Sequence, residues 1–233
     1  MSDRPIQNDG IGAPLPRRED IRLLTGRGVY AGDNSPHDVC HAVLVRSPHA
    51  HARIRSIDTR RATTMPGVLA VLTGADAIAD GMGAIPHNPD WKGPPDAELR
   101  IPSDFEVYLT ENHPLPAERI RYVGEAVALV VAETVAIAND AAEHVDVHYE
   151  PLPAVVDAQD AMCSELPPIW PDCPGNTALT CEVGDADATA HAFSQAAHVI
   201  RFSGHIQRVL GNPMEPRAVV GEYDPDSDFY TLR

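Results

Sequence analysis

The sequence holds 233 residues, a length that fits one large domain or one complete domain followed by part of a second. Its net charge of -16 is spread along the chain, which argues against a nucleic-acid or anionic-membrane surface because such partners require clustered Lys and Arg. The apolar content of 43% is sufficient for a packed core. We attribute the acidic balance to solubility, with a basic partner subunit as the alternative.

The N-terminus is polar and acidic, without the apolar segment of a secretory signal, and no window approaches the hydrophobicity of a membrane span. Cysteine usage gives no metal or disulfide signal, because CxxC spacing and His partners at metal-site intervals are missing around Cys40, Cys163, Cys173 and Cys181. These observations predict a cytoplasmic protein with unpaired thiols.

The first part of the chain is expected to be a flexible, Pro-rich lead over residues 1–18. A compact pattern follows over residues 20–33, where Gly26, Gly28 and Gly32 mark tight turns. The Gly-x-Gly spacing there is no dinucleotide fingerprint, since a third glycine and a preceding strand are both missing.

Short apolar runs and turn signals then predict alternating strands and helices. The expected strands cover residues 39–45, 46–57, 68–72, 119–132 and 146–156. Helices are expected over residues 59–64, from Thr73 onward and over residues 135–145, the last with Thr134 as its N-cap. A long connection over residues 81–116 suggests an excursion that contacts another domain or a partner.

We therefore predict an α/β (α+β) domain over residues 19–156, a Pro-rich linker over 157–182 and an incomplete second unit over 183–233. In the second unit we expect a helix over residues 184–197 and strands over 198–209, 218–223 and 228–232. The sequence stops at Arg233 directly after a strand without a closing cap, so we expect the chain to be the front part of a larger protein.

Three groups of polar residues are candidates for chemistry. His49 and His51 could chelate zinc, although a third ligand is not evident and a tight turn explains them better. Glu125 follows Gly124 inside an apolar run, so it is either a buried general base or, as we favour, the partner of Arg119 or Arg121. Two further residues, Glu215 and Arg217, form an ion pair or bind a polar ligand.

Five ordered segments together resemble the large, molybdopterin-binding subunit of the xanthine dehydrogenase and aldehyde oxidase family, and the carbon monoxide dehydrogenase-like large subunits in particular. They read Arg18-Glu-Asp-Ile-Arg-Leu-Leu-Thr-Gly-Arg-Gly-Val-Tyr, Val45-Arg-Ser-Pro-His-Ala-His-Ala-Arg-Ile, Pro66-Gly-Val-Leu-Ala-Val-Leu-Thr-Gly, Val123-Gly-Glu-Ala-Val-Ala-Leu-Val-Val-Ala and Tyr149-Glu-Pro-Leu-Pro-Ala-Val-Val. The resemblance implies an a/b hammerhead domain over residues 19–156. It also implies that Pro213-Met-Glu-Pro-Arg217 leads into the first molybdenum-cofactor-binding domain.

The same resemblance implies an oxidoreductase that hydroxylates an aldehyde, an N-heterocycle or a similar small substrate with water as the oxygen source. The implied cofactor is molybdenum–molybdopterin, as the cytosine dinucleotide form, with 2Fe–2S and FAD centres on partner subunits. The family's glycine-rich cofactor loop and catalytic glutamate correspond to sequence beyond Arg233, so no catalytic residue or metal ligand is assigned here. Gln207 is the one candidate for contact with the cofactor.

These features lead us to expect the N-terminal part, split or truncated, of a molybdenum hydroxylase large subunit. The expected partners are the remainder of that subunit, an iron–sulfur subunit and an FAD subunit, and the isolated chain is expected to be inactive. The alternative is a non-catalytic assembly or interaction module that retains the hammerhead fold. A free-standing small-molecule binder is disfavoured because the second unit has too few strands to close a pocket.

Overall fold

The structure is a computed structural model that describes residues 12, 16–34, 36, 38–86, 99–163, 165, 167–207, 209–213, 215 and 217–233. The chain divides into two compact units. One comprises residues 40–202, and the other combines residues 1–39 with residues 203–233.

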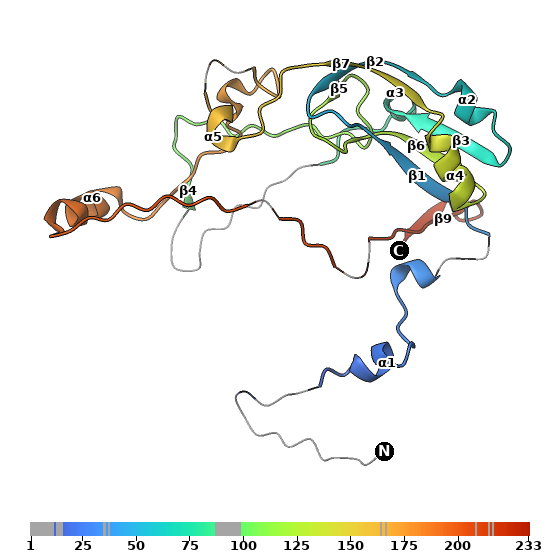
Figure 1. The fold of residues 1–233 in the computed structure, drawn as a ribbon, viewed down its shortest axis with the longest axis horizontal. Helices are drawn as coiled ribbons and strands as arrows, with labels where there is room; N and C mark the ends of the chain where they lie inside the picture. Colours follow the sequence, from blue (N-terminus) through green and yellow to red (C-terminus); the bar gives the residue numbers. More distant parts are fainter. Residues whose placement is uncertain are drawn as a thin grey trace. The chain divides into compact units, whose positions relative to one another are not determined.

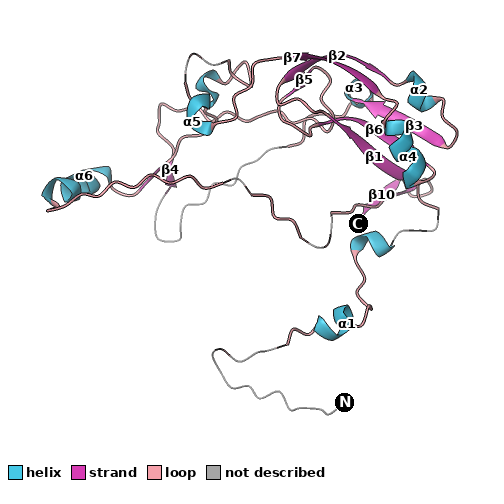
Figure 2. Cartoon of the chain, in the orientation of Figure 1, coloured by secondary structure: helices cyan, strands magenta, loops and turns pink. Residues whose placement is uncertain are grey.

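The described residues of the unit over 40–202 form eight short strands and several short helices (Figure 2). Its strands are β1 (His41–Arg46), β2 (Ala52–Asp58), β3 (Val68–Thr73), β4 (Leu99–Arg100), β5 (Arg119–Ile120), β6 (Ala126–Ala132), β7 (Asp146–Pro151) and β8 (Glu182–Val183). Its helices are α2 (Arg60–Thr63), α3 (Gly74–Ala79), α4 (Val135–Ala142), α5 (Ala158–Ala161), the 3-10 turn η2 (Pro174–Asn176) and α6 (Ala186–Gln195).

Two three-stranded sheets carry this unit, in the orders β1-β6-β3 and β5-β2-β7 (Figure 1). A smaller ladder joins β4 to β8. All of these pairings are antiparallel, so the predicted mixture of helices and strands is confirmed as an α+β arrangement whose described strands form no parallel sheet.

The core lies where helices α2 and α4 pack on one face of the β1-β6-β3 sheet. Ala62 and Ala141 on these helices contact Ala128 and Val130 on β6, and all four side chains are fully buried. A second cluster joins Ala52, Ile120 and Val127. The half-buried side chains of Val45, Ile57 and Val147 pack against both clusters, so they join the two sheets into one apolar interior.

Local chemistry explains where the helices begin. The Thr134 hydroxyl accepts a hydrogen bond from the Ile137 N–H at 3.2 Å, which confirms the predicted N-cap of α4. Thr59 precedes α2 but its side chain makes no cap bond. Instead the Asp58 carboxylate accepts the Arg60 N–H at 3.0 Å, and its bonds to Arg60 lower the pKa of Asp58 to about 2.

The predicted strand over residues 119–132 is wrong in one respect, because the structure divides it into β5 and β6, which belong to different sheets. Gly124 adopts a φ of +85°, a left-handed conformation that breaks the strand and that glycine adopts without strain. The Gly124 N–H donates to the Ser47 carbonyl at 2.8 Å, and the Ser47 N–H donates to the Glu125 carbonyl at 2.9 Å. These bonds hold the turn against the chain that leaves β1.

The two segments predicted to lack regular structure contain short elements. The connection over residues 81–116 includes β4 and an isolated bridge between Ile85 and Asn112, while its residues 87–98 lie outside the described part. The expected linker over residues 157–182 includes α5 and η2. Inside it, the Asn176 side chain donates to the Ala161 carbonyl at 2.9 Å and accepts the Ile169 N–H at 2.7 Å. The domain boundaries themselves stay a prediction.

In the other unit, α1 (Asp20–Leu24) and the 3-10 turn η1 (Ala31–Asn34) precede a hairpin of β9 (Gly221–Asp224) and β10 (Phe229–Leu232). The Tyr223 and Tyr230 rings lie 4.5 Å apart across this hairpin. The strand predicted over residues 198–209 is wrong, since its described residues form neither helix nor strand. Ile200 and Phe202, at the end of the unit over residues 40–202, and Ile206, in the other unit, are more than nine-tenths exposed, so these side chains pack against almost none of the described residues.

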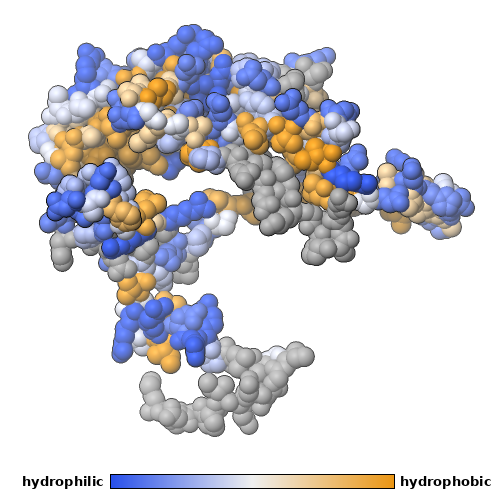
Figure 3. Space-filling model, turned by 180° about the vertical axis from the view of Figure 1, so that it is seen from behind, coloured by the Kyte–Doolittle hydropathy of each residue, from blue (hydrophilic) through white to orange (hydrophobic). Residues whose placement is uncertain are grey.

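Hydrophobic side chains also reach the surface elsewhere, as the orange regions of the space-filling view show (Figure 3). Leu44 and Leu72 both pair in register with Leu129, so the three leucines form one row across the β1-β6-β3 sheet. Leu44 is 40% exposed and Leu72 is 38% exposed. None of the helices among the described residues combines the length and the apolar character needed to cross a bilayer.

Candidate functional site

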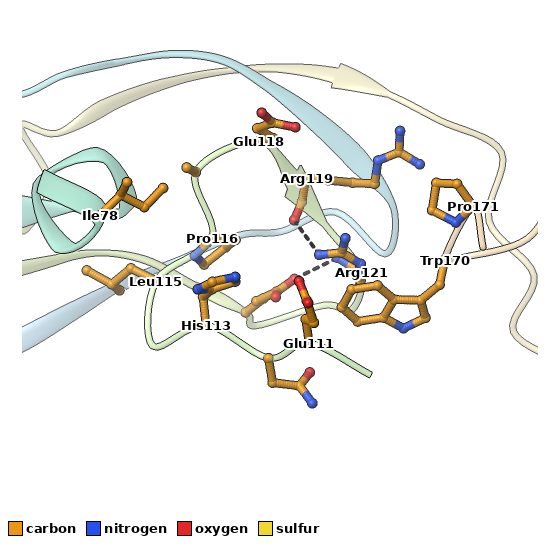
Figure 4. A pocket seen from close by; sticks show the side chains of 13 residues that line it. Ile78, Glu111, His113, Leu115, Pro116, Glu118, Arg119, Arg121, Trp170 and Pro171 are labelled. Atoms are coloured by element: carbon orange, nitrogen blue, oxygen red, sulfur yellow. Dashed lines mark hydrogen bonds between the residues drawn. The ribbon is translucent and has the colours of Figure 1, made fainter. Parts of the chain in front are cut away.

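One concave site of the unit over residues 40–202 is a cavity of about 320 Å³. Helix α3 contributes Ile78, the chain before β5 contributes Leu115 and Pro116, and the turn after β5 contributes Arg121. In the close view, Arg121 and Trp170 lie at one end of the cavity, and Ile78 and Leu115 lie at the other (Figure 4). The site therefore has a cationic, aromatic end and an aliphatic end.

A close backbone approach fixes the aliphatic end. Gly74, the first residue of α3, is buried against Pro116 and Ala117, and a Cβ on Gly74 would lie 2.6 Å from the Pro116 carbonyl carbon. The helix is held at its start by the Asp76 carboxylate, which accepts the Thr73 N–H at 2.7 Å. These contacts set the distance between α3 and the chain that leads into β5.

Glu125 lies in the turn that the sequence singled out. Its carboxylate accepts the backbone N–H of Arg121 at 2.6 Å, and the Tyr122 N–H also bonds to it. Half-burial of this side chain raises the pKa of Glu125, while these backbone bonds and the charge of Arg121 act in the opposite direction. The favoured partner, Arg121, is thus adjacent, but the bond comes from its backbone and not from its guanidinium. This geometry gives Glu125 a structural role in the turn.

The Arg121 guanidinium lies over the indole of Trp170, with its central carbon 3.5 Å from the ring centroid. Its Nη1 is 3.5 Å from the Arg119 carbonyl, the long limit of a hydrogen bond, and its Nε is buried without a partner. Burial lowers the pKa of Arg121, although a guanidinium stays charged at any physiological pH. A buried donor without an acceptor costs about 1–3 kcal/mol, so this site is incompletely satisfied.

Trp170 comes from the segment predicted to be a linker, and several contacts hold it in place. The Tyr108 ring centroid lies 6.4 Å from that of Trp170, and the Tyr108 N–H donates to the Ala178 carbonyl at 2.9 Å. The Cys173 N–H donates to the Trp170 carbonyl at 3.0 Å, and burial raises the pKa of the Cys173 thiol. Sequence reasoning missed this role of Trp170. The available signal was a tryptophan in a chain with only 5% aromatic residues.

His49 and His51 precede β2 and have different surroundings. His51 is buried, and its Nδ1 lies 2.8 Å from the Pro153 carbonyl while its Nε2 lacks a partner. The His49 ring meets the Tyr149 ring edge-on, with centroids 4.8 Å apart. Within the described part of the chain, no three His, Cys, Asp or Glu side chains gather as metal ligands would. Both histidines therefore have structural contacts in this unit.

The candidate cofactor contact, Gln207, lies in the exposed segment after residue 198 and outside any helix or strand. An exposed amide can donate a hydrogen bond to a pterin, but on its own it does not enclose one, so the assignment stays a prediction. Glu215 and Arg217 are exposed as well. Met214, which precedes Glu215, and Pro216, which separates Glu215 from Arg217, lie outside the described residues. The ion pair predicted for Glu215 and Arg217 also stays a prediction.

Comparison with known proteins gives the family. The family described as aldehyde oxidase and xanthine dehydrogenase, a/b hammerhead domain, matches residues 25–92 and 98–153. Two relatives from Paenarthrobacter nicotinovorans are similar over nearly the whole chain. These are the gamma subunit of the 6-hydroxypseudooxynicotine dehydrogenase complex, 38% identical over 94% of this chain, and the nicotine 6-hydroxylase large subunit, 37% identical over 96%.

Solved structures agree with this assignment. Quinoline 2-oxidoreductase from Pseudomonas putida 86 is similar with a TM-score of 0.71 and 35% identity over 94% of this chain. The Cu,Mo-CO dehydrogenase gives a TM-score of 0.75 and 31% identity over 96%. The chain spans about a quarter of the length of each of these proteins, 26% or 27%. On the family match and these similarities, the chain belongs to the aldehyde oxidase and xanthine dehydrogenase family.

Proposed function

We propose that the chain forms the N-terminal part of the large subunit of a molybdenum hydroxylase and acts within an assembled oxidoreductase. The observation that carries the proposal is the coverage. The chain matches large or catalytic subunits of such enzymes over more than nine-tenths of its own length, but over only 26% of the two Paenarthrobacter proteins. The hammerhead domain is thus the part of the enzyme that this chain supplies.

The exposed apolar surface supports association with further protein. Ile200, Phe202 and Ile206 expose more than nine-tenths of their surface, and Leu44 and Leu72 leave one sheet face partly uncovered. Apolar surface exposed in this way is typical of a protein–protein interface. We infer that the remainder of the large subunit covers it, and that iron–sulfur and FAD subunits complete the enzyme, as the name of the gamma-subunit relative describes a multi-subunit complex.

For the substrate we propose an N-heterocycle in preference to an aldehyde. Two of the relatives at 35–38% identity are named for nicotine and quinoline, and both compounds contain a nitrogen ring. The cofactor proposed for the assembled enzyme is molybdopterin in its cytosine dinucleotide form, which supplies the oxidative chemistry. This chain contributes scaffold, with Gln207 as the one candidate contact to that cofactor, and we propose that it is inactive alone and cytoplasmic.

The proposal is tested by comparing the purified chain with the complex that co-purifies with it from the source cells. Oxidation of quinoline or nicotine is measured as the reduction of an artificial dye. It should occur with the complex and not with the isolated chain. Activity of the isolated chain would contradict the proposal. If the captured proteins contain no redox centre and the preparation reduces no dye, the non-catalytic assembly module is favoured instead.

A further inference from the structure

The cavity between Arg121 and Ile78 has no role in the function proposed above, and its chemistry is specific. Arg121 brings a positive charge to the cavity wall, and no described carboxylate lies within 4.0 Å of its guanidinium. The nearest acid by sequence, Glu125, is already bonded to the backbone N–H groups of Arg121 and Tyr122. The guanidinium therefore has donors that the described residues leave unused.

The stacking of Arg121 on Trp170 determines how a ligand would bind. The central carbon of the guanidinium lies 3.5 Å from the centroid of the indole ring, and the N–H donors of a guanidinium all lie in the plane of that group. The outer nitrogens are the ones that a ligand in the cavity would reach, since Nε is buried. Two in-plane N–H groups match the two oxygens of a carboxylate, which makes a planar carboxylate the best-fitting acceptor.

The other walls limit the charge and the size of the ligand. Glu111, Glu118 and Glu125 also line the cavity and outnumber its two cations, Arg119 and Arg121, so a multiply charged anion such as phosphate would be repelled more strongly than a monoanion. At the opposite end Ile78, Leu115 and Pro116 offer an aliphatic surface. The volume of about 320 Å³ equals that of roughly ten water molecules, which suits an acid of about six carbon atoms.

We propose that this cavity, the Arg121–Trp170 pocket, binds a small aliphatic monocarboxylate. The carboxylate pairs with the Arg121 guanidinium beside Trp170, and the hydrocarbon chain lies against Ile78, Leu115 and Pro116. Binding would give the guanidinium an acceptor, and it would join the turn after β5, helix α3 and the segment that carries Trp170 through one ligand.

Hexanoate is the probe, and the fluorescence of Trp170 is the readout. The full chain is used with Trp91→Phe as background, so that Trp170 is its only tryptophan. Titration at constant ionic strength should give a saturable change with a Kd on the order of 1 mM. Hexanol, which has the same chain without the charge, and inorganic phosphate should each bind at least about tenfold more weakly.

Three variants identify the contacts. Arg121→Gln removes the charge and Arg121→Lys keeps it without the planar fork, and both should weaken hexanoate binding by about tenfold or more. Ile78→Phe fills the aliphatic end from an exposed position on α3 without adding a second tryptophan, and should weaken binding to the same degree. Arg61→Gln is the matched control, because Arg61 is exposed on α2 and does not line the pocket.

The proposal holds if hexanoate binds saturably, if Arg61→Gln binds within about twofold of the parent, and if the pocket variants lose binding. It is overturned if the parent shows no saturable change, if phosphate binds as tightly as hexanoate, or if Arg121→Lys and Ile78→Phe bind like the control. Far-UV circular dichroism establishes that each variant is folded. If Arg121→Gln unfolds, the lysine and phenylalanine variants decide the result on their own.

Discussion

Replacing Gly74 by alanine tests the packing that positions α3 beside the chain before β5. The new Cβ would lie 2.6 Å from the Pro116 carbonyl carbon and 2.7 Å from both the Pro116 oxygen and the Ala117 nitrogen. All three are backbone atoms, so a side-chain rotation cannot relieve the overlap. Relief requires movement of the helix or of the strand connection, and overpacking of this kind costs about 1–3 kcal/mol.

Alanine also restricts the unfolded chain more than glycine does, which offsets about 0.4–1 kcal/mol of that cost. The net expectation is a loss of about 1–2 kcal/mol in the free energy of unfolding. For a chain of this size about 2–4 °C of melting temperature corresponds to each kcal/mol, so Gly74→Ala should melt about 2–8 °C lower than the parent.

Thermal unfolding followed by far-UV circular dichroism measures this shift. Gly83→Ala is the matched control, because it makes the same substitution where nothing lies within 4 Å of the new Cβ. The control should melt at or slightly above the parent temperature. If Gly74→Ala melts within about 1 °C of Gly83→Ala, α3 does not approach Pro116 as closely as described. That contact would then not be what positions the aliphatic end of the pocket.

Three further substitutions probe the core, a helix cap and the turn at Glu125. Val130→Ala, at a fully buried position, should destabilise the fold by about 2–3 kcal/mol in urea unfolding, whereas Val135→Ala, at a half-exposed position, should change little. Thr134→Ala should cost about 1 kcal/mol by the same measurement, and Thr134→Ser should retain the cap. Because burial raises the pKa of Glu125 above 4.5, its protonated form favours folding at low pH, and this contribution is lost as pH rises through the folded-state pKa. The parent should therefore lose stability relative to Glu125→Gln as the pH rises from about 4, near the usual pKa of a glutamate, through the raised folded-state pKa of Glu125. An unchanged difference between the two proteins would refute the burial argument.

The sequence predicted best where the pattern was local. Thr134 and the apolar stripe behind it predict α4, and the helix begins at the expected residue although it ends at Ala142 and not at residue 145. The strand over residues 119–132 was predicted as one element because its apolar run is nearly continuous. Gly124 was recognised as a break, but periodicity alone cannot tell that the chain passes from one sheet to another there.

Interactions between distant parts of the chain were the hardest to predict. Arg121 was considered as a partner for Glu125, yet its guanidinium packs on Trp170, which lies 49 residues further along the sequence. The segment over residues 198–209 was predicted as a strand, but a strand also needs a neighbour, and the described residues provide none for Ile200 or Phe202.

The proposed membership of a molybdenum hydroxylase complex is tested most directly by metal analysis. A complex purified through a tag on this chain should contain about one molybdenum atom per copy of the chain, together with iron and FAD, and should also contain the remaining large-subunit sequence. If the purified preparation contains neither molybdenum nor a redox-active partner, that result contradicts the account.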